Sequence, residues 1–190
     1  MTRAYVVGLL VIALPCAAVA EPVTLKGLAP GMTKAQVAEA HPSITKSCMK
    51  PQDSVMTDEV CGYSNKHHSG APALHTFAGV PVESWTVMLK EGIVHTVMII
   101  LPSEKFEDAE TAVTERWGKP SHRGTSTVQN RMGATFDQVD ARWLREGSVL
   151  RGMKRGGNVT KATFSLTTER GMEERYKAKK DAAKAAASDM

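Results

Sequence analysis

Two cysteines and three histidines carry most of the reactive chemistry that this chain offers. The third cysteine of the chain, Cys16, lies in the N-terminal segment that we expect to be cleaved. Cys48 and Cys61 are separated by twelve residues, and an even pair of thiols in an exported chain predicts a disulfide. One alternative is a metal site that joins both thiolates to His67 and His68, and another is a site built from the loop histidines alone, His67, His68 and His75. Zinc sites prefer two to four residues between paired cysteines, so the spacing favours the disulfide.

The motifs of common enzyme classes do not occur in the sequence. There is no G-x-S-x-G, H-E-x-x-H, phosphate-binding loop or dinucleotide-binding fingerprint, and two paired cysteines leave no thiolate nucleophile. We therefore expect no catalytic residue and no cofactor. A hydrolase of unrecognised type stays open as an alternative.

The N-terminal residues have the composition of a secretory signal peptide. A basic residue, Arg3, precedes an apolar run over 6–14, and Ala18 and Ala20 form an A-x-A cleavage site. The alternative, an uncleaved anchor, is disfavoured because a membrane span needs about 20 apolar residues. We predict cleavage after Ala20, a periplasmic or secreted protein, and no transmembrane segment in the mature chain.

Positive charge is concentrated in the C-terminal half of the chain. Residues 116–161 contain ten Lys or Arg and three acidic residues, whereas residues 21–75 contain five of each sign. This asymmetry favours contact with an anionic envelope surface or an acidic envelope protein, and the candidate contact residues are Arg151, Lys154, Arg155 and Lys161. The alternative is an ordinary solvated face of an antiparallel sheet. Nucleic acid is not expected, because an exported protein does not meet it and no aromatic residues are interleaved with the charges.

Helix signals occur at three places. Thr33 and Gln36 have capping-box spacing before a short helix that ends at His41-Pro42. Ser103 is expected to cap a second helix whose apolar stripe is Phe106, Ala109, Val113 and Trp117. Residues 169–190 are rich in Lys, Ala and Glu, which predicts a solvated helical tail.

Between these helices the sequence predicts an irregular loop and two groups of strands. Residues 42–80 are rich in Pro, Ser, His, Asp and Gly and are expected to form a long loop. A hairpin with its turn at Glu91-Gly92 is predicted over 82–101. Three further strands are predicted over 137–145, 148–155 and 161–168, with turns at Glu146-Gly147 and at 156–158. The fold class is thus α+β, an antiparallel sheet with short helices on one face. After residues 1–20, one domain spans 21–168, with 21–101 and 102–168 as two candidate α-then-β-hairpin units.

The segments PGMTKAQV, at 30–37, and ERWGKPS, at 115–121, resemble parts of a known group. They are similar to the helix start and helix end of small exported envelope proteins with the β-lactamase-inhibitor-protein-like fold. The resemblance covers about forty residues. It implies a helical layer on an antiparallel sheet, and a function in surface contact rather than catalysis. It carries over no binding residue, because the matched positions are structural.

The sequence therefore favours an exported, non-catalytic interaction protein. The first alternative is a small-ligand or metal-binding protein that uses the 42–80 loop, and the second is the hydrolase.

The exported protein should begin at Glu21 and contain no free thiol. The reason is the A-x-A site together with the even number of cysteines that remain after cleavage. Intact mass spectrometry of protein recovered from the envelope fraction, before and after thiol labelling in denaturant, measures both. A retained Met1 or a labelled cysteine would contradict the prediction.

Overall fold

The protein is built on one antiparallel sheet of eight strands, in the order β1-β2-β5-β6-β10-β9-β8-β7. The structure is a computed structural model, and it describes residues 23–51, 57–64 and 74–188. The strands of the main sheet are β1 (Cys48–Met49), β2 (Glu59–Ser64), β5 (Ser84–Lys90), β6 (Ile93–Pro102), β7 (His122–Gln129), β8 (Thr135–Arg145), β9 (Ser148–Met153) and β10 (Lys161–Thr168). A separate pair consists of β3 (Thr76–Phe77) and β4 (Val80–Pro81). The predicted α+β fold is confirmed.

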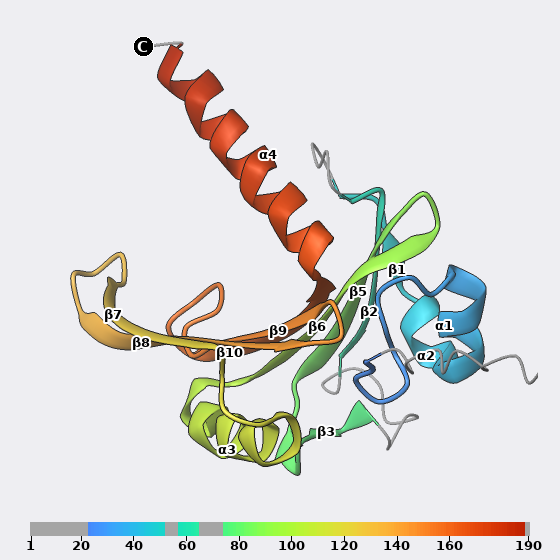
Figure 1. Cartoon of the computed structure of the whole chain (residues 1–190), viewed down its shortest axis with the longest axis horizontal. Helices are drawn as coiled ribbons and strands as arrows, with labels where there is room; N and C mark the ends of the chain where they lie inside the picture. Colours follow the sequence, from blue (N-terminus) through green and yellow to red (C-terminus); the bar gives the residue numbers. More distant parts are fainter. Residues whose placement is uncertain (1–22, 52–56, 65–73, 189–190) are drawn as a thin grey trace, which may run out of the picture.

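The helices lie on opposite sides of the sheet. They are α1 (Lys34–Ala40), α2 (Pro42–Thr45), the 3₁₀ turn η2 (Ser103–Lys105), α3 (Phe106–Trp117) and α4 (Glu169–Ser188). Figure 1 shows α3 beneath the sheet and α4 rising from the end of β10 on the opposite side. We call the face that α3 covers the core face and the other the open face. Val37 of α1 and Ile44 of α2 are buried in the same cluster as the core-face residues.

Each half of the sheet is an antiparallel meander that follows a helical segment. The first half orders its strands β1-β2-β5-β6, and the second orders them β10-β9-β8-β7. The final strands of the halves, β6 and β10, pair with each other at the centre, with Ile99 opposite Phe164. Helix α3 therefore starts directly where one meander ends and leads into the next.

Local sequence signals are confirmed at several elements. Thr33 forms the predicted capping box with Gln36, and β5 and β6 form the predicted hairpin. Glu91-Gly92 and Glu146-Gly147 both adopt positive φ in two-residue turns, as the type I′ hairpin requires. The sequences around them, LKEGIV at 89–94 and LREGSV at 144–149, are similar because each forms this turn. The two hairpins occupy different places in the sheet, since β5–β6 closes the first meander whereas β8–β9 lies in the middle of the second.

Two expectations about elements are wrong, and one strand was not predicted. The 42–80 segment contributes β2 to the sheet, where Cys61 and Tyr63 face inward. Strand β7 was not anticipated, because most of its side chains are exposed and no alternation marks it. Ser103 does not cap α3 with its side chain; it begins η2, and its hydroxyl accepts a hydrogen bond from Arg155.

The centre of the core face is aromatic. The ring of Phe164 lies 5.5 Å from that of Phe106 and 6.3 Å from that of Trp143, centroid to centroid. Gly152 leaves room for this cluster, because a Cβ there would lie 2.8 Å from a ring carbon of Phe164. The cluster fastens α3 to β8, β9 and β10.

No helix in the ranges that the structure describes is both long enough and apolar enough to cross a bilayer. The expected signal peptide at 1–20 lies outside the described residues.

Replacing Phe106 with alanine should lower the free energy of unfolding by about 3–5 kcal/mol, because the ring is fully buried. Trp117 is only partly buried against the core, so Trp117→Ala should cost less. Chemical denaturation of both variants and the unmodified protein measures the difference. A loss below about 1 kcal/mol for Phe106→Ala would contradict the packing of α3.

Candidate functional site

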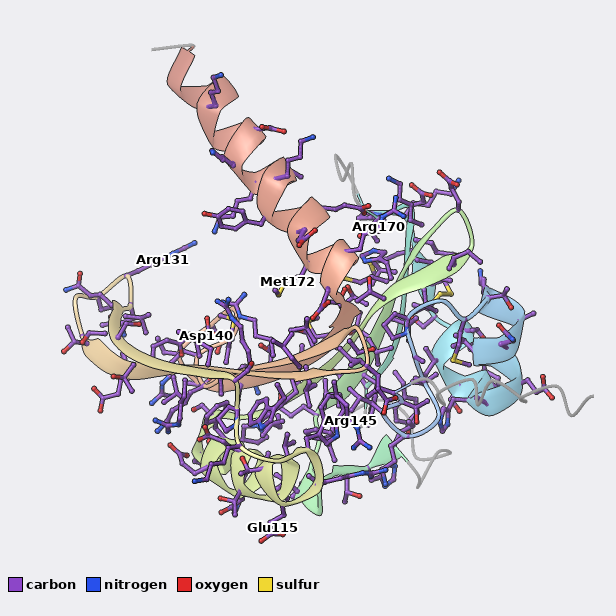
Figure 2. The ribbon with its side chains drawn as sticks, viewed as in Figure 1. Glu115, Arg131, Asp140, Arg145, Arg170 and Met172 are labelled. Atoms are coloured by element: carbon purple, nitrogen blue, oxygen red, sulfur yellow. A yellow bond between two sulfur atoms is a disulfide. The ribbon has the colours of Figure 1, made fainter. Side chains whose placement is uncertain are left out.

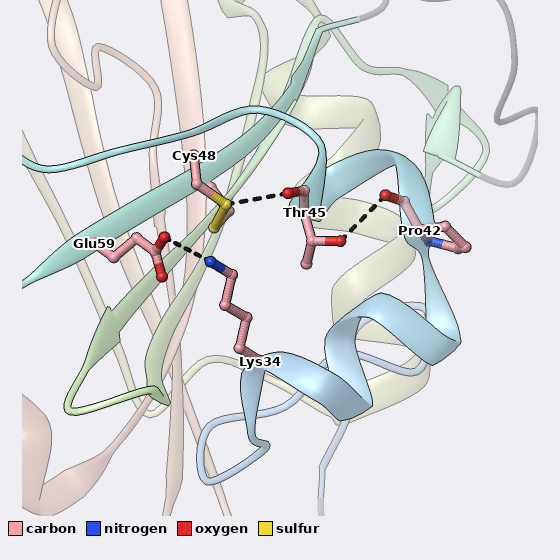
Figure 3. Close-up of a disulfide and its surroundings, with 6 residues drawn as sticks. Lys34, Pro42, Thr45, Cys48 and Glu59 are labelled. Atoms are coloured by element: carbon pink, nitrogen blue, oxygen red, sulfur yellow. Dashed lines mark hydrogen bonds and ion pairs between the residues drawn. A yellow bond between two sulfur atoms is a disulfide. The ribbon is translucent and has the colours of Figure 1, made fainter.

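The predicted disulfide is confirmed. Cys48 and Cys61 are opposite residues of β1 and β2, and their sulfur atoms are bonded at 2.05 Å. Figure 3 shows the bond beside Lys34 of α1, whose ammonium group lies 2.6 Å from the Glu59 carboxylate. Glu59 and the two sulfur atoms are close enough for a metal site. However, both sulfurs are engaged in the disulfide and Glu59 is paired with Lys34.

The histidines divide between described and undescribed segments. His67 and His68 lie outside the described residues. His75 lies next to β3, with its Nε2 3.3 Å from the Tyr63 hydroxyl oxygen and its ring stacked on Tyr63. His95, on β6, has its Nε2 3.0 Å from the Thr57 hydroxyl oxygen and its Nδ1 3.0 Å from the Thr96 hydroxyl oxygen. His75 and His95 therefore each contact neighbouring side chains of the fold.

The candidate basic residues do not form one surface. Lys154 pairs with Glu107 of α3 on the core-face side, and Lys161 pairs with Glu83. The Arg155 guanidinium donates to the Ser103 hydroxyl and to the Val159 carbonyl, and it lies over the Phe136 ring. Arg155 therefore ties the β9–β10 turn to the start of α3.

Arg151 is the exception, because it lies on the open face. It is directly opposite Ser165 of β10 and Arg142 of β8, and side chains at directly opposite positions share a face. This places it in a row that crosses seven strands: Gly62, Thr86, Met98, Ser165, Arg151, Arg142 and His122. The residues of this row on β2, β5, β6 and β10 carry no ionisable side chain, whereas those on β9, β8 and β7 are two arginines and a histidine.

The basic end of this row is organised around one carboxylate. Arg151 donates from Nε and Nη2 to the two Asp140 oxygens, at 3.0 and 2.6 Å. Arg142 donates to the same oxygens at 3.5 and 3.2 Å. We call these three residues the arginine cluster; Figure 2 shows Asp140 on the same side of the sheet as α4. The carboxylate orients two guanidinium groups that would otherwise repel each other, and the net charge is +1.

Burial and hydrogen bonding act on Asp140 in opposite directions. Burial disfavours the charged carboxylate, but the hydrogen bonds from Arg151 and Arg142 and their positive charges outweigh it. The pKa of Asp140 is therefore held below its ordinary value, and the cluster keeps its charges at neutral pH.

The guanidinium groups remain accessible. The side chains of Arg142 and Arg151 are 37% and 39% exposed, against 23% for Asp140. Each guanidinium has five N–H donors, and Asp140 accepts two from each. The remaining donors can bind a second anion, because arginine matches carboxylate and phosphate oxygens in a two-pronged geometry. His122 is the next residue of the row, opposite Arg142. Gly124 lies opposite Asp140, and the absence of a side chain there leaves room for the His122 ring, because a Cβ at Gly124 would lie 3.2 Å from the His122 Nε2.

The sequence held a signal for this cluster. A two-residue turn at Glu146-Gly147 sets the register of β8 against β9, and that register places Arg142 opposite Arg151. Asp140 and Arg142 share a face because they are two residues apart on one strand. Counting charge along the chain hid this, since it grouped Arg151 with residues that face elsewhere.

No protein-family model, no curated protein and no solved structure is significantly similar to this chain.

Replacing Asp140 with asparagine should lower the free energy of unfolding at neutral pH by about 1 kcal/mol, because two facing arginines lose their shared counter-charge. The lowered pKa means that the carboxylate stabilises the fold above its unfolded-state pKa of about 3.9. This contribution is lost as the pH falls through the folded-state pKa. Urea denaturation should thus show a full difference near pH 7 that shrinks below about pH 4.

Glu146→Gln is the matched control, because Glu146 is an exposed partner of Arg145 at 3.6 Å. It should change the stability little at either pH. If the loss in free energy of unfolding caused by Asp140→Asn stays constant down to acidic pH, the charge of Asp140 is not the cause of that loss.

Proposed function

We propose that this is an exported, non-catalytic binding protein that recognises an anionic envelope partner through its open face. The arginine cluster is the charged anchor of that surface. The observation that carries the proposal is the geometry of Arg142 and Arg151, two accessible guanidinium groups held in place by one carboxylate.

Export is supported by two independent features. Residues 1–20 have the pattern of a secretory signal, and the Cys48–Cys61 disulfide is typical of proteins that work in an oxidising compartment. Envelope compartments are rich in phosphate and carboxylate groups on lipids, polysaccharides and proteins. A surface with fixed arginines suits such partners.

The rest of the open face suits contact with a larger partner. Met98, Ile100 and Met153 are partly exposed there, between strands that also present Thr86, Ser165 and other hydroxyl residues. Methionine adapts its shape to different contacts, and hydroxyls donate or accept hydrogen bonds. Arg131, at the tip of the β7–β8 loop, extends on the same side as Asp140 and Met172 (Figure 2). An anion bound at the cluster would therefore have apolar and polar surface beside it.

Neutralising the cluster should weaken binding to anionic partners about tenfold or more, since each lost charge-assisted contact contributes about 1.4 kcal/mol or more. The variant combines Asp140→Asn, Arg142→Gln and Arg151→Gln, which removes the net charge and retains groups that hydrogen-bond. Binding is measured by co-sedimentation with vesicles of anionic phospholipid, and by titration with an acidic peptide, at two salt concentrations. Binding by the unmodified protein should fall as salt rises.

The matched control is Arg145→Gln, which lowers the net charge by one, as the cluster variant does, at a residue outside the cluster. It should bind as the unmodified protein does. Equal loss in both variants would show a non-specific charge effect, and loss in neither would refute the role of the cluster. Substitutions at Arg155 are unsuitable for this test, because its guanidinium holds the β9–β10 turn.

A further inference from the structure

The two edges of the sheet differ in what they expose. Strand β1 has two residues, and its Cys48 is bonded to Cys61 next to α2. Strand β7 has eight residues and pairs only with β8 among the strands that the structure describes. A long, unpaired edge strand is a template for another strand.

The pairing with β8 determines which backbone groups of β7 point outward. The Asn130 N–H donates to the Ala134 carbonyl at 2.9 Å, just beyond the strand ends and in the same register. Hydrogen-bonded and non-hydrogen-bonded pairs alternate along an antiparallel ladder, so the even-numbered residues of β7 bond to β8. The N–H and C=O groups that point away from β8 belong to Arg123, Thr125, Thr127 and Gln129.

The usual protection of an edge strand is missing from β7. Natural edges carry Pro, Lys, bulges or covering segments, whereas β7 reads HRGTSTVQ and pairs with β8 in unbroken register. Its one formally charged side chain is that of Arg123, whose Nε lies 2.7 Å from the carboxylate of Glu110 in α3. A hollow of about 530 Å³ lies on the core-face side of the same strand, lined by Thr125, Ser126, Thr127, Asp137, Val139 and Lys154. In the part of the chain that the structure describes, no strand covers the outer edge of β7.

We propose that β7 pairs antiparallel with β7 of a second copy of this chain, with the two-fold axis at Ser126. In this register Thr125 lies opposite Thr127 of the other copy, and Arg123 lies opposite Gln129. All four outward-facing residues then exchange backbone hydrogen bonds with the other copy. If the axis lay at Thr125 instead, Gln129 would lie opposite Ser121, which is outside β7. No like charges face each other, and threonine pairs across strands are favourable.

A second copy fits this edge better than an unrelated peptide. Recognition of a peptide by strand addition takes its specificity from side-chain pockets, but β7 presents Gly124, Thr125, Ser126 and Thr127 at its centre. These small residues suit close symmetric approach. Because β1 offers no comparable edge, the association closes at a dimer and does not extend into a fibre. This inference does not depend on anion binding by the arginine cluster.

Cysteine cross-linking tests the pairing and its register together. Ser126 and its symmetry mate would be a non-hydrogen-bonded pair, with Cα atoms about 4.5 Å apart, which is within the range of a disulfide. Ser126→Cys should therefore form a covalent dimer under a mild oxidant. Val128→Cys is the matched control. In this register Val128 lies opposite Gly124 of the other copy, so the two Val128 positions are offset by four residues, or about 13 Å along the strand. It should stay monomeric on non-reducing gels.

Proline at the edge gives the second measurement. Thr125→Pro removes an N–H that points away from β8, so the fold should tolerate it, and dimerisation should weaken about tenfold or more. Thr125→Val keeps the N–H and should dimerise like the unmodified protein. Sedimentation velocity over a concentration series measures the association, and circular dichroism checks the fold.

Concentration-dependent dimers that Thr125→Pro weakens, together with selective cross-linking of Ser126→Cys, would support the proposal. It would be overturned by an unmodified protein that stays monomeric throughout, by equal cross-linking at both cysteine positions, or by a folded Thr125→Pro variant that dimerises unchanged. A monomer that binds an unrelated extended peptide at β7 would likewise overturn it.

Discussion

The pairing of β6 with β10 is the constraint on which the rest of the structure depends. These strands lie 59 or more residues apart in the chain, between Pro102 and Lys161, and they join the two meanders into one sheet. Thr167 strengthens the joint, because its hydroxyl donates to the His95 carbonyl at 2.9 Å. On the core face the pairing places Phe164 beside Ile99, where both are fully buried. Without this ladder, Phe164 would not be held against Phe106 of α3 and Trp143 of β8.

The alternation of side chains along these strands separates stability from recognition. Phe164, Leu150 and Trp143 point to the core face and are buried against α3 and its neighbours. The residues between them, such as Ser165, Arg151 and Arg142, point to the open face and stay partly exposed. The same ladder therefore positions both the packed core and the polar surface. The arginine cluster depends on this, because Asp140 can orient both arginines only while β8 and β9 keep their register.

Charge is distributed on this molecule by topology more than by composition. Lys154, Arg155 and Lys161 each hold two distant segments together, through Glu107, Ser103 and Glu83 respectively. Residues that look like a basic patch along the chain thus act as structural ties. On the open face, Arg142 and Arg151 share one counter-ion and retain donors that Asp140 does not accept.

The sequence by itself determined the features that depend on near neighbours. The capping box at Thr33, the hairpin turns with Gly92 and Gly147, and the apolar spacing of α3 are local signals, and the structure has each of them. The cysteine pair could also be predicted from the sequence: once Cys16 is assigned to the expected signal peptide, the two remaining thiols have one pairing. Tertiary structure decided what needed distant partners. Strand β7 has no apolar face of its own and is a strand because β8 pairs with it, and β2 is drawn from a polar loop by β5. The arginine cluster exists only in the register that brings Arg151 opposite Arg142, because electrostatic contacts depend on distance in space and not on spacing along the chain.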